Sequence, residues 1–450
     1  MAKPYGNQHD TCSRAAGDYG GEPLIVRSTP VPDPGSLLEE IPVPGKAFSW
    51  IRHGSGLVGW GEAARVTLPA GEDRFTTGEK WLREVADSAD VTDDAGCRGS
   101  GLVAFGSFTF DSSSEGSVLV VPRVLLGRDG RGGAWLTTVT RTGEAAAASA
   151  SDSTTPLERP SRITWHDGSL SAMEWEEAVA AAVRRIGRGD LRKVVLARDL
   201  FASADRRLDQ RVLLRRLAAR YPDCYTFACA GLVGATPELL ISRDGSEVTS
   251  LVLAGTMPRG SSAAEDARIA RELLGSAKDN EEHAYAVASL REILTPLCDD
   301  LVIAPHPEVL RLPNLQHLGT PVRGMLRADA DRRGSLALAA ALHPTAAVGG
   351  TPTGAAVELI RELEIMDRGR YAGPVGWTDS EGNGEWGIAL RCAQLDGNQA
   401  RLFAGGGIVK DSDPGTELIE TQIKFRPMRT ALEQTDLSPL SGVVALNRQP

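Results

Sequence analysis

The first half of the chain alternates short apolar runs with turn residues. Between about residues 46 and 142, Gly and Asp separate several of these runs, a pattern typical of strands joined by turns. We therefore predict a β-rich region, with one helix over residues 78–88. The predicted strands cover residues 47–51, 57–60, 101–110, 117–126 and 135–140.

Two segments lack this pattern. Residues 1–45 are rich in Pro, Gly, Asp and Ser without periodicity, which predicts a mostly disordered tail. Residues 143–160 are small and polar, which predicts a flexible loop that limited proteolysis would cut first. Residues 46–450 are predicted to form a single domain, with its core over residues 161–435.

The second half mixes helical and strand patterns. Ser171 followed by Glu174 forms a capping box, so a helix should begin there and run to about residue 186. Further helices are predicted over residues 206–220, 263–298, 337–342, 355–367 and from Asp413-Pro414 onward, with a kink or interruption at Pro427. Strands are predicted over residues 191–197, 225–230, 239–243, 247–253, 373–377, 385–395 and 400–405.

Many of the predicted strands are joined by hairpin-like turns, as at Asp244-Gly245. Strands joined in this way run antiparallel, whereas a doubly wound fold needs parallel strands connected through helices. The sequence therefore predicts an α+β fold in which helices pack outside antiparallel sheets.

Composition narrows the possible functions. The chain has 450 residues, of which 42% are hydrophobic, and a net charge of −10. The negative charge disfavours a nucleic-acid or anionic-membrane partner. No apolar run approaches the roughly 20 residues of a membrane span, and the first residues lack the apolar segment of a signal peptide. The scattered cysteines form no C-x-x-C pair, as expected of a reduced cytoplasmic protein.

Carboxylates on two predicted helices are candidates for a cation site. Glu417 and Glu420 are three residues apart and share a helix face. Lys424 follows one turn later, so a solvated helix with an ordinary ion pair explains the spacing equally well. Glu281 and Glu282 lie on another predicted helix. Carboxylates that converge from separate helices would suit Mg2+, which prefers oxygen ligands.

A glycine run and one lysine add to these candidates. The glycines at 405–407 would let the backbone approach an anion, although a bulge or tight turn is the alternative. Lys193 lies on a predicted strand in a chain whose other basic residues are mostly Arg, and Lys can lose its proton where Arg cannot. The sequence contains no zinc-binding cluster, P-loop or dinucleotide fingerprint.

Nine motifs, spread over roughly residues 165–432, together resemble the chorismate-utilising enzyme family. In order they are KVVLARDL, GATPELLISRDG, LAGTMPRG, KDNEEHAYAV, LQHLGTPVRGML, LHPTAAVGGTP, RYAGPVGWTD, GIALRCA and AGGGIVKDSDPGTELIETQIK. The β-rich half carries a weaker echo, in FGSFTFD and VLVVPRVLL. This family comprises isochorismate, salicylate, anthranilate and aminodeoxychorismate synthases. The resemblance implies antiparallel sheets packed in a sandwich with helices outside.

The resemblance also implies an acid and a base. Lys193 matches the general base that deprotonates the water attacking C2 of chorismate, a role that requires a neutral amine. Glu238 matches the general acid that protonates the departing C4 hydroxyl, so its pKa should lie above the usual range.

Ligand positions follow from the same resemblance. The family's Mg2+ ligands match Glu282, Glu417 and Glu420. The substrate-binding positions match Gly255, Thr256, His317, Tyr371, Arg391, Gly406, Gly407 and Lys424. Among these, Arg391 suits the enolpyruvyl carboxylate because guanidinium pairs with carboxylate through two hydrogen bonds. His317 either lies near the ring carboxylate or is a structural histidine.

Two positions discriminate between members of the family, and one segment departs from the family pattern. Lys193 favours water as the nucleophile, because anthranilate synthases carry Gln there and use ammonia, usually from a glutaminase partner. Ala254 disfavours the aminodeoxychorismate branch, which needs a nucleophilic Lys at that position. The segment 343–348 lacks the second Pro of the family's H-P-T-P-A-V, which should only affect loop rigidity.

The stretches AGPVGW and LHPT resemble the isochorismate branch. We therefore expect a cytoplasmic, monomeric isochorismate synthase that takes chorismate and Mg2+ and needs no glutaminase subunit. A salicylate synthase, which goes on to eliminate pyruvate, is the alternative, and a non-catalytic chorismate-binding protein is a third possibility. Isochorismate would feed menaquinone, salicylate or catechol siderophores, and the sequence does not distinguish these pathways.

Overall fold

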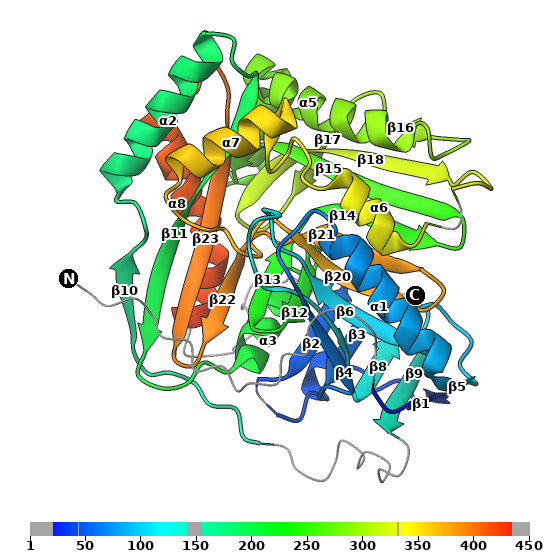
Figure 1. Cartoon of the computed structure of the whole chain (residues 1–450). Helices are drawn as coiled ribbons and strands as arrows, with labels where there is room; N and C mark the ends of the chain where they lie inside the picture. Colours follow the sequence, from blue (N-terminus) through cyan, green and yellow to red (C-terminus); the bar gives the residue numbers. More distant parts are fainter. Residues whose placement is uncertain (1–20, 44, 142–154, 331–332, 434–450) are drawn as a thin grey trace, which may run out of the picture.

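The computed structural model describes residues 21–43, 45–141, 155–330 and 333–433. Its strands form a first sheet of 13 strands and a second sheet of 10, with helices packed on their outer faces (Figure 1). The predicted α+β class with antiparallel sheets is therefore confirmed. Among the helices of the described residues, none is long and apolar enough to cross a membrane.

The first sheet supplies one wall of the site described below. Its strand order is β10 (Ile163–Asp167), β11 (Lys193–Ala204), β23 (Gln399–Ile408), β22 (Cys392–Asp396), β13 (Leu232–Thr236), β12 (Tyr225–Cys229), β2 (Ala47–Arg52), β3 (Ser55–Trp60), β8 (Val124–Arg128), β9 (Ala134–Arg141), β1 (Leu24–Val31) and β5 (Asp90–Asp93), and β19 (Gly350–Thr351) pairs with β11. β11 and β23 are antiparallel neighbours, and their register places Val195 opposite Gly407.

The second sheet supplies the other wall. Its strand order is β16 (Val302–Ile303), β18 (Leu315–Met325), β15 (Glu247–Pro258), β14 (Leu239–Asp244), β21 (Gly384–Ile388), β20 (Pro374–Asp379), β6 (Val103–Ser107), β7 (Ser117–Val121) and β4 (Ala64–Leu68), and β17 (Glu308–Arg311) pairs with β18. β15 and β18 are long antiparallel partners, and their register places Thr256 opposite His317.

The helices cover the outer faces of the two sheets. They are α1 (Arg74–Ser88), α2 (Ala172–Gly187), α3 (Gln210–Arg220), α4 (Ala263–Gly275), α5 (Ala277–Leu294), α6 (Ser335–Leu342), α7 (Thr353–Leu363) and α8 (Pro414–Glu433), with a 3-10 turn η1 (Leu37–Glu39). α2 and α8 pack on β23 of the first sheet, whereas α5 packs on β15 and α6 on β14 of the second (Figure 1). The predicted capping box is present at the start of α2.

Aromatic side chains join the two sheets. Phe48 on β2 stacks on Phe105 on β6, with ring centroids 5.5 Å apart. Beside this pair, the Trp50 indole Nε1 donates a hydrogen bond of 2.6 Å to Glu385 Oε2 on β21. Burial of a large apolar side chain stabilises a fold by roughly 1.5–3 kcal/mol, so these contacts hold the sheets face to face.

The expectation of a disordered tail over residues 1–45 is wrong for its second half. Residues 24–31 form β1, which pairs with β9 and, in parallel, with β5. Leu24 and Val26 are fully buried, because alternate residues of this strand face a small apolar cluster under α1. The strand carries Pro30 near its end, which hid the alternation in the sequence. Residues 1–20 and most of the predicted 143–160 loop lie outside the described residues.

Other predicted elements differ in their boundaries. The predicted strand over 117–126 is two strands, β7 and β8, and the long helical region over 263–298 is α4 and α5, with Ser276 capping α5. The predicted interruption at Pro427 does not occur, since α8 continues through it to Glu433. Proline removes one helical hydrogen bond, and burial of Phe425 and Met428 on the same helix offsets that loss.

Candidate active site

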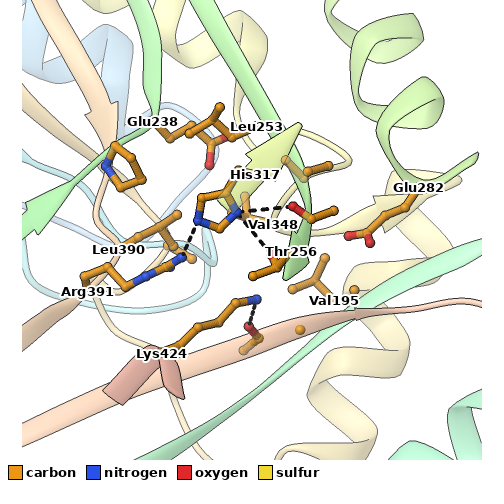
Figure 2. Close-up of a pocket in the computed structure, with 18 of the residues that line it drawn as sticks. Val195, Glu238, Leu253, Thr256, Glu282, His317, Val348, Leu390, Arg391 and Lys424 are labelled. Atoms are coloured by element: carbon orange, nitrogen blue, oxygen red, sulfur yellow. Dashed lines mark hydrogen bonds between the residues drawn. The ribbon is translucent and has the colours of Figure 1, made fainter. Parts of the chain in front are cut away.

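A pocket of about 590 Å3 lies where β11 and β23 of the first sheet approach β15 and β18 of the second (Figure 2). Its lining includes most of the site residues predicted from the sequence, namely Glu238, Gly255, Thr256, Glu282, His317, Tyr371, Arg391, Gly406, Gly407 and Lys424. Residues far apart in the chain are therefore brought together. Lys193, Glu417 and Glu420 are not in this lining. Each of them lies against a residue that is: Glu282, Gly406 and Lys424, respectively.

Lys193 is the first residue of β11, and its side chain is completely buried. Its Nζ atom lies 3.2 Å from Glu282 Oε1 on α5 and, among the described residues, forms no hydrogen bond. The register of β11 against β23 carries the Lys193 side chain next to Gly407, whose missing Cβ would lie 3.1 Å from Lys193 Cε. Lys193 thus lies beside two residues of the pocket lining, Gly407 and Glu282.

Glu238 lies between β13 and β14, with its side chain in the pocket. Burial raises the pKa of this carboxyl to about 8, and the nearby cations Arg391, Lys193 and Lys424 offset only part of that rise. The group is therefore a neutral acid at neutral pH, the form that can donate a proton. This agrees with the direction predicted from the sequence.

The three carboxylates predicted to bind a metal each face a lysine. The ion pairs are Glu282–Lys193 at 3.2 Å, Glu417–Lys278 at 2.7 Å and Glu420–Lys424 at 2.5 Å. Burial and the neighbouring Glu420 carboxylate raise the pKa of Glu417, although Lys278 and Ser412 work against the rise. Two carboxylates side by side, one buried and one partly exposed, favour an added cation.

Glycines 406 and 407 create the room for these carboxylates. A Cβ on Gly407 would lie 2.1 Å from Glu282 Oε1, and a Cβ on Gly406 would lie 3.0 Å from Glu417 Oε2. Both distances are shorter than van der Waals contact. The glycine run on β23 thus lets carboxylates from α5 and α8 converge on one strand, as close backbone approach requires.

The fit of a metal ion to this site rests on its donor set. Three carboxylates supply only oxygen ligands, which suits a hard divalent cation such as Mg2+. In the described part of the chain, however, no three His, Cys, Asp or Glu side chains converge closely enough to hold a metal as they lie. The carboxylates are turned toward their lysines instead, so metal binding would require these pairs to loosen.

His317 on β18 contacts three other pocket residues. Its Nδ1 lies 3.2 Å from the Gly255 carbonyl oxygen and 3.1 Å from Thr256 Oγ1, and its Nε2 lies 3.2 Å from an Arg391 guanidinium nitrogen (Figure 2). Burial and the cations Arg391 and Lys424 hold its pKa well below the usual range, so the ring is neutral. Nδ1–H can then donate to Gly255 while Nε2 accepts from Arg391.

Arg391 and Tyr371 complete the substrate side of the pocket. Arg391 has a φ of 49°, the left-handed region that non-glycine residues rarely adopt. Strained backbone of this kind persists where surrounding structure holds it, commonly at functional sites. The Tyr371 ring is stacked on Phe403 with centroids 5.0 Å apart, and burial raises the pKa of its hydroxyl, so this hydroxyl stays protonated.

The sequence reasoning missed Arg368, which also lines the pocket. Its guanidinium donates to the Val348 carbonyl at 2.9 Å and to the Val195 carbonyl at 2.7 Å, and it pairs with the buried Glu364. These bonds fix β11 near Lys193. The i,i+4 spacing of Glu364 and Arg368 was visible in the sequence, but such pairs are most often solvated.

The fold and the pocket define an enzyme site in which positively and negatively charged side chains lie buried together. The family profile described as chorismate binding enzyme matches residues 24–433. The chain therefore belongs to the chorismate-binding enzyme family, as its motifs predicted.

Relatives in this family carry informative names. A Mycobacterium tuberculosis protein, provisionally named isochorismate synthase MenF, is 44% identical over 314 residues, which is 61% of this chain and 84% of that protein. The isochorismate synthase DhbC of Bacillus subtilis is 41% identical over 270 residues, 58% of this chain and 67% of the relative. The solved structure of MenF, the menaquinone-specific isochorismate synthase of Escherichia coli, superposes with a TM-score of 0.75 at 26% identity, covering 92% of this chain and 95% of that structure.

Proposed function

We propose that this protein is an isochorismate synthase, which converts chorismate to isochorismate by adding water at C2 with loss of the C4 hydroxyl. The observation that carries the proposal is the buried Glu238 carboxyl, whose pKa of about 8 keeps a proton available inside the pocket. The relatives named above support the same activity. Substrate and product are isomers, so the enzyme is an isomerase.

The proposed reaction divides the proton transfers between two residues. Lys193, with its amine neutral, takes a proton from water as the water oxygen bonds to C2. The two ring double bonds shift from C1=C2 and C5=C6 to C1=C6 and C4=C5, the C4–O bond breaks, and Glu238 gives its proton to the departing hydroxyl, which leaves as water. Lys193 and Glu238 then exchange protons with solvent, so atoms and charge balance over a full turnover.

Binding residues would orient the substrate for this step. Arg391 would grip the enolpyruvyl carboxylate through its paired N–H donors, and His317 would keep the guanidinium turned toward the pocket. The Tyr371 hydroxyl and the amides of Gly406 and Gly407 line the same space. A bound Mg2+ would be held by the carboxylates of Glu282, Glu417 and Glu420 and would supply a positive charge for the ring carboxylate.

Lys193 also bears on the nucleophile and the partners. The anthranilate-type branch of the family carries Gln at this position, so Lys193 supports water and a chain that acts without a glutaminase subunit. We propose that the protein acts as a monomer in the cytoplasm.

A product assay tests the proposal. Purified protein is incubated with chorismate and Mg2+, with and without EDTA, and the products are separated by liquid chromatography. Isochorismate without pyruvate, formed only when EDTA is absent, is the expected result. Salicylate with stoichiometric pyruvate would reassign the protein to the lyase branch, and no turnover of any kind would leave only a binding protein.

A further inference from the structure

Lys278 is a lysine of the site that has no role in the proposed reaction. It lies in the first turn of α5, and its Nζ atom donates to Glu417 Oε1 at 2.7 Å. The Ser412 hydroxyl donates to the same oxygen at 2.8 Å. The other oxygen of this carboxylate, Oε2, faces Gly406 at the pocket wall. One oxygen of the Glu417 carboxylate is thus held by two hydrogen bonds, while its other oxygen points to the substrate space.

The charges of the three pairs cancel. Three glutamates face three lysines, so these six groups together carry no formal net charge when all are ionised. A divalent cation is attracted by net negative charge, and every cationic side chain nearby weakens that attraction. The lysines therefore oppose metal binding as much as the glutamates favour it.

Lys278 differs from the other two lysines in its surroundings. Its side chain is 34% exposed, whereas those of Lys193 and Lys424 are 0% and 10% exposed. Lys424 is additionally fixed by a hydrogen bond of 2.8 Å to the Gly405 carbonyl. Lys278 can turn out to solvent at little cost, because long lysine side chains readily move their charged end into water.

We propose that Lys278 acts as an internal counter-cation that holds the Glu417 carboxylate in the metal-free site and sets how tightly the site binds Mg2+. The inference rests on the proposed function, which makes Glu417 a metal ligand. In the metal-free enzyme, the ammonium prevents repulsion between Glu417 and Glu420. When a divalent cation arrives, the same ammonium competes with it for Glu417 and must leave. Lys278 is thus a positioning residue that tunes metal affinity.

Calorimetric titration of Mg2+ into the purified protein without substrate tests this role. The variant Lys278→Met removes the charge with little change of volume, and Lys278→Gln removes it while keeping a hydrogen-bond donor. Both should bind Mg2+ on the order of tenfold more tightly than the wild type, as expected when one repelling unit charge is removed a few ångströms from a divalent ion. Lys278→Arg, which keeps the charge, should stay close to the wild type.

Lys80→Met is the matched control, since this exposed lysine pairs with Glu84 on α1, outside the site, and its loss should leave Mg2+ affinity unchanged. Equal Mg2+ binding by the wild type and both Lys278 variants, including no measurable binding by any of them, overturns the inference. Weaker binding by the variants also overturns it, because Lys278 would then support the ligand set without competing. Failure of the proposed function is scored separately, by the absence of isochorismate when the wild type is incubated with chorismate and Mg2+.

Discussion

The Lys193 Nζ atom lies 3.2 Å from Glu282 Oε1, and the lysine side chain is completely buried. One ion pair therefore contains the proposed base and a proposed metal ligand, delivered by β11 of the first sheet and by α5 on the second. Lys193 can take a proton from water only with a neutral amine, so this pair must loosen when the site is loaded. The proposed acid, Glu238, needs no such change, because burial already keeps it protonated.

Replacing Lys193 by Met should abolish the proton transfer and leave the pocket shape nearly intact. Since positioned general bases contribute roughly 10²–10⁴-fold to rates, kcat for isochorismate formation should fall by that factor, with chorismate affinity little changed. Steady-state kinetics and calorimetry measure the two quantities. Lys80→Met serves as the control for loss of a lysine elsewhere. A variant that keeps wild-type kcat would exclude Lys193 as the base.

The pH dependence of activity should reflect the ionisation of the Glu238 carboxyl. The acid form is required and the pKa is raised to about 8 in the free enzyme, so kcat/KM should fall as the pH rises through about 8. Glu238→Gln should lose most activity and show no alkaline limb belonging to this group. An unchanged limb in the residual activity would assign it to another residue.

The same pKa shift makes a prediction about stability. Burial raises the pKa of Glu238 from 4.5 to about 8, so ionising it in the folded state costs free energy that Gln does not incur. The stability of the wild type relative to Glu238→Gln should therefore decline as the pH rises from about 4.5 to about 8. Denaturant unfolding at several pH values measures this difference, and a constant difference would contradict the shift.

Gly407→Ala should damage the site with little effect on the fold. The new Cβ would overlap the Glu282 carboxylate at 2.1 Å, and that flexible side chain can move away, taking a proposed metal ligand out of position. We expect a large loss of kcat and weaker Mg2+ binding, with a melting temperature near that of the wild type. Gly354→Ala, in the first turn of α7, is a control with free space at its Cβ and no positive φ. Full activity in Gly407→Ala would refute the close approach of Glu282.

Glu364 should be important for stability. Arg368 is buried, and its ion pair with Glu364 is buried with it, so Glu364→Ala leaves an uncompensated charge at a cost of about 3–5 kcal/mol. The matched control is Arg361→Ala, which breaks the more exposed pair with Asp111 and should cost only about 0–1 kcal/mol. Urea unfolding compares them, and equal losses would contradict the argument.

Most elements of the second half were predictable because local signals coincide with tertiary packing. The capping box of Ser171 and Glu174 begins α2, and Asp244-Gly245 joins β14 to β15. β18 was not predicted, since Gly319 and Pro321 interrupt its apolar pattern. Its longest partner, β15, is distant in the sequence, and hydrogen bonds to it form most of the strand.

The candidate site, too, was predictable only in part. Family motifs placed Glu282, Gly406 and Lys424 in one pocket, and the structure brings them together. Which lysine faces which carboxylate could not be predicted, because the pairs depend on how α5 packs on β15 and how α8 packs on β23. The pairing of Lys278 with Glu417 spans 139 residues of sequence, and no local spacing predicts it.

The most direct test of the proposed reaction is mass spectrometry of isochorismate formed from unlabelled chorismate in water enriched in 18O. If solvent water attacks C2 while the C4 hydroxyl leaves, each isochorismate molecule carries one 18O atom at C2, and Lys193→Met forms almost none of this product. Isochorismate that contains no 18O, or wild-type protein that forms no isochorismate from chorismate and Mg2+, would contradict the proposal.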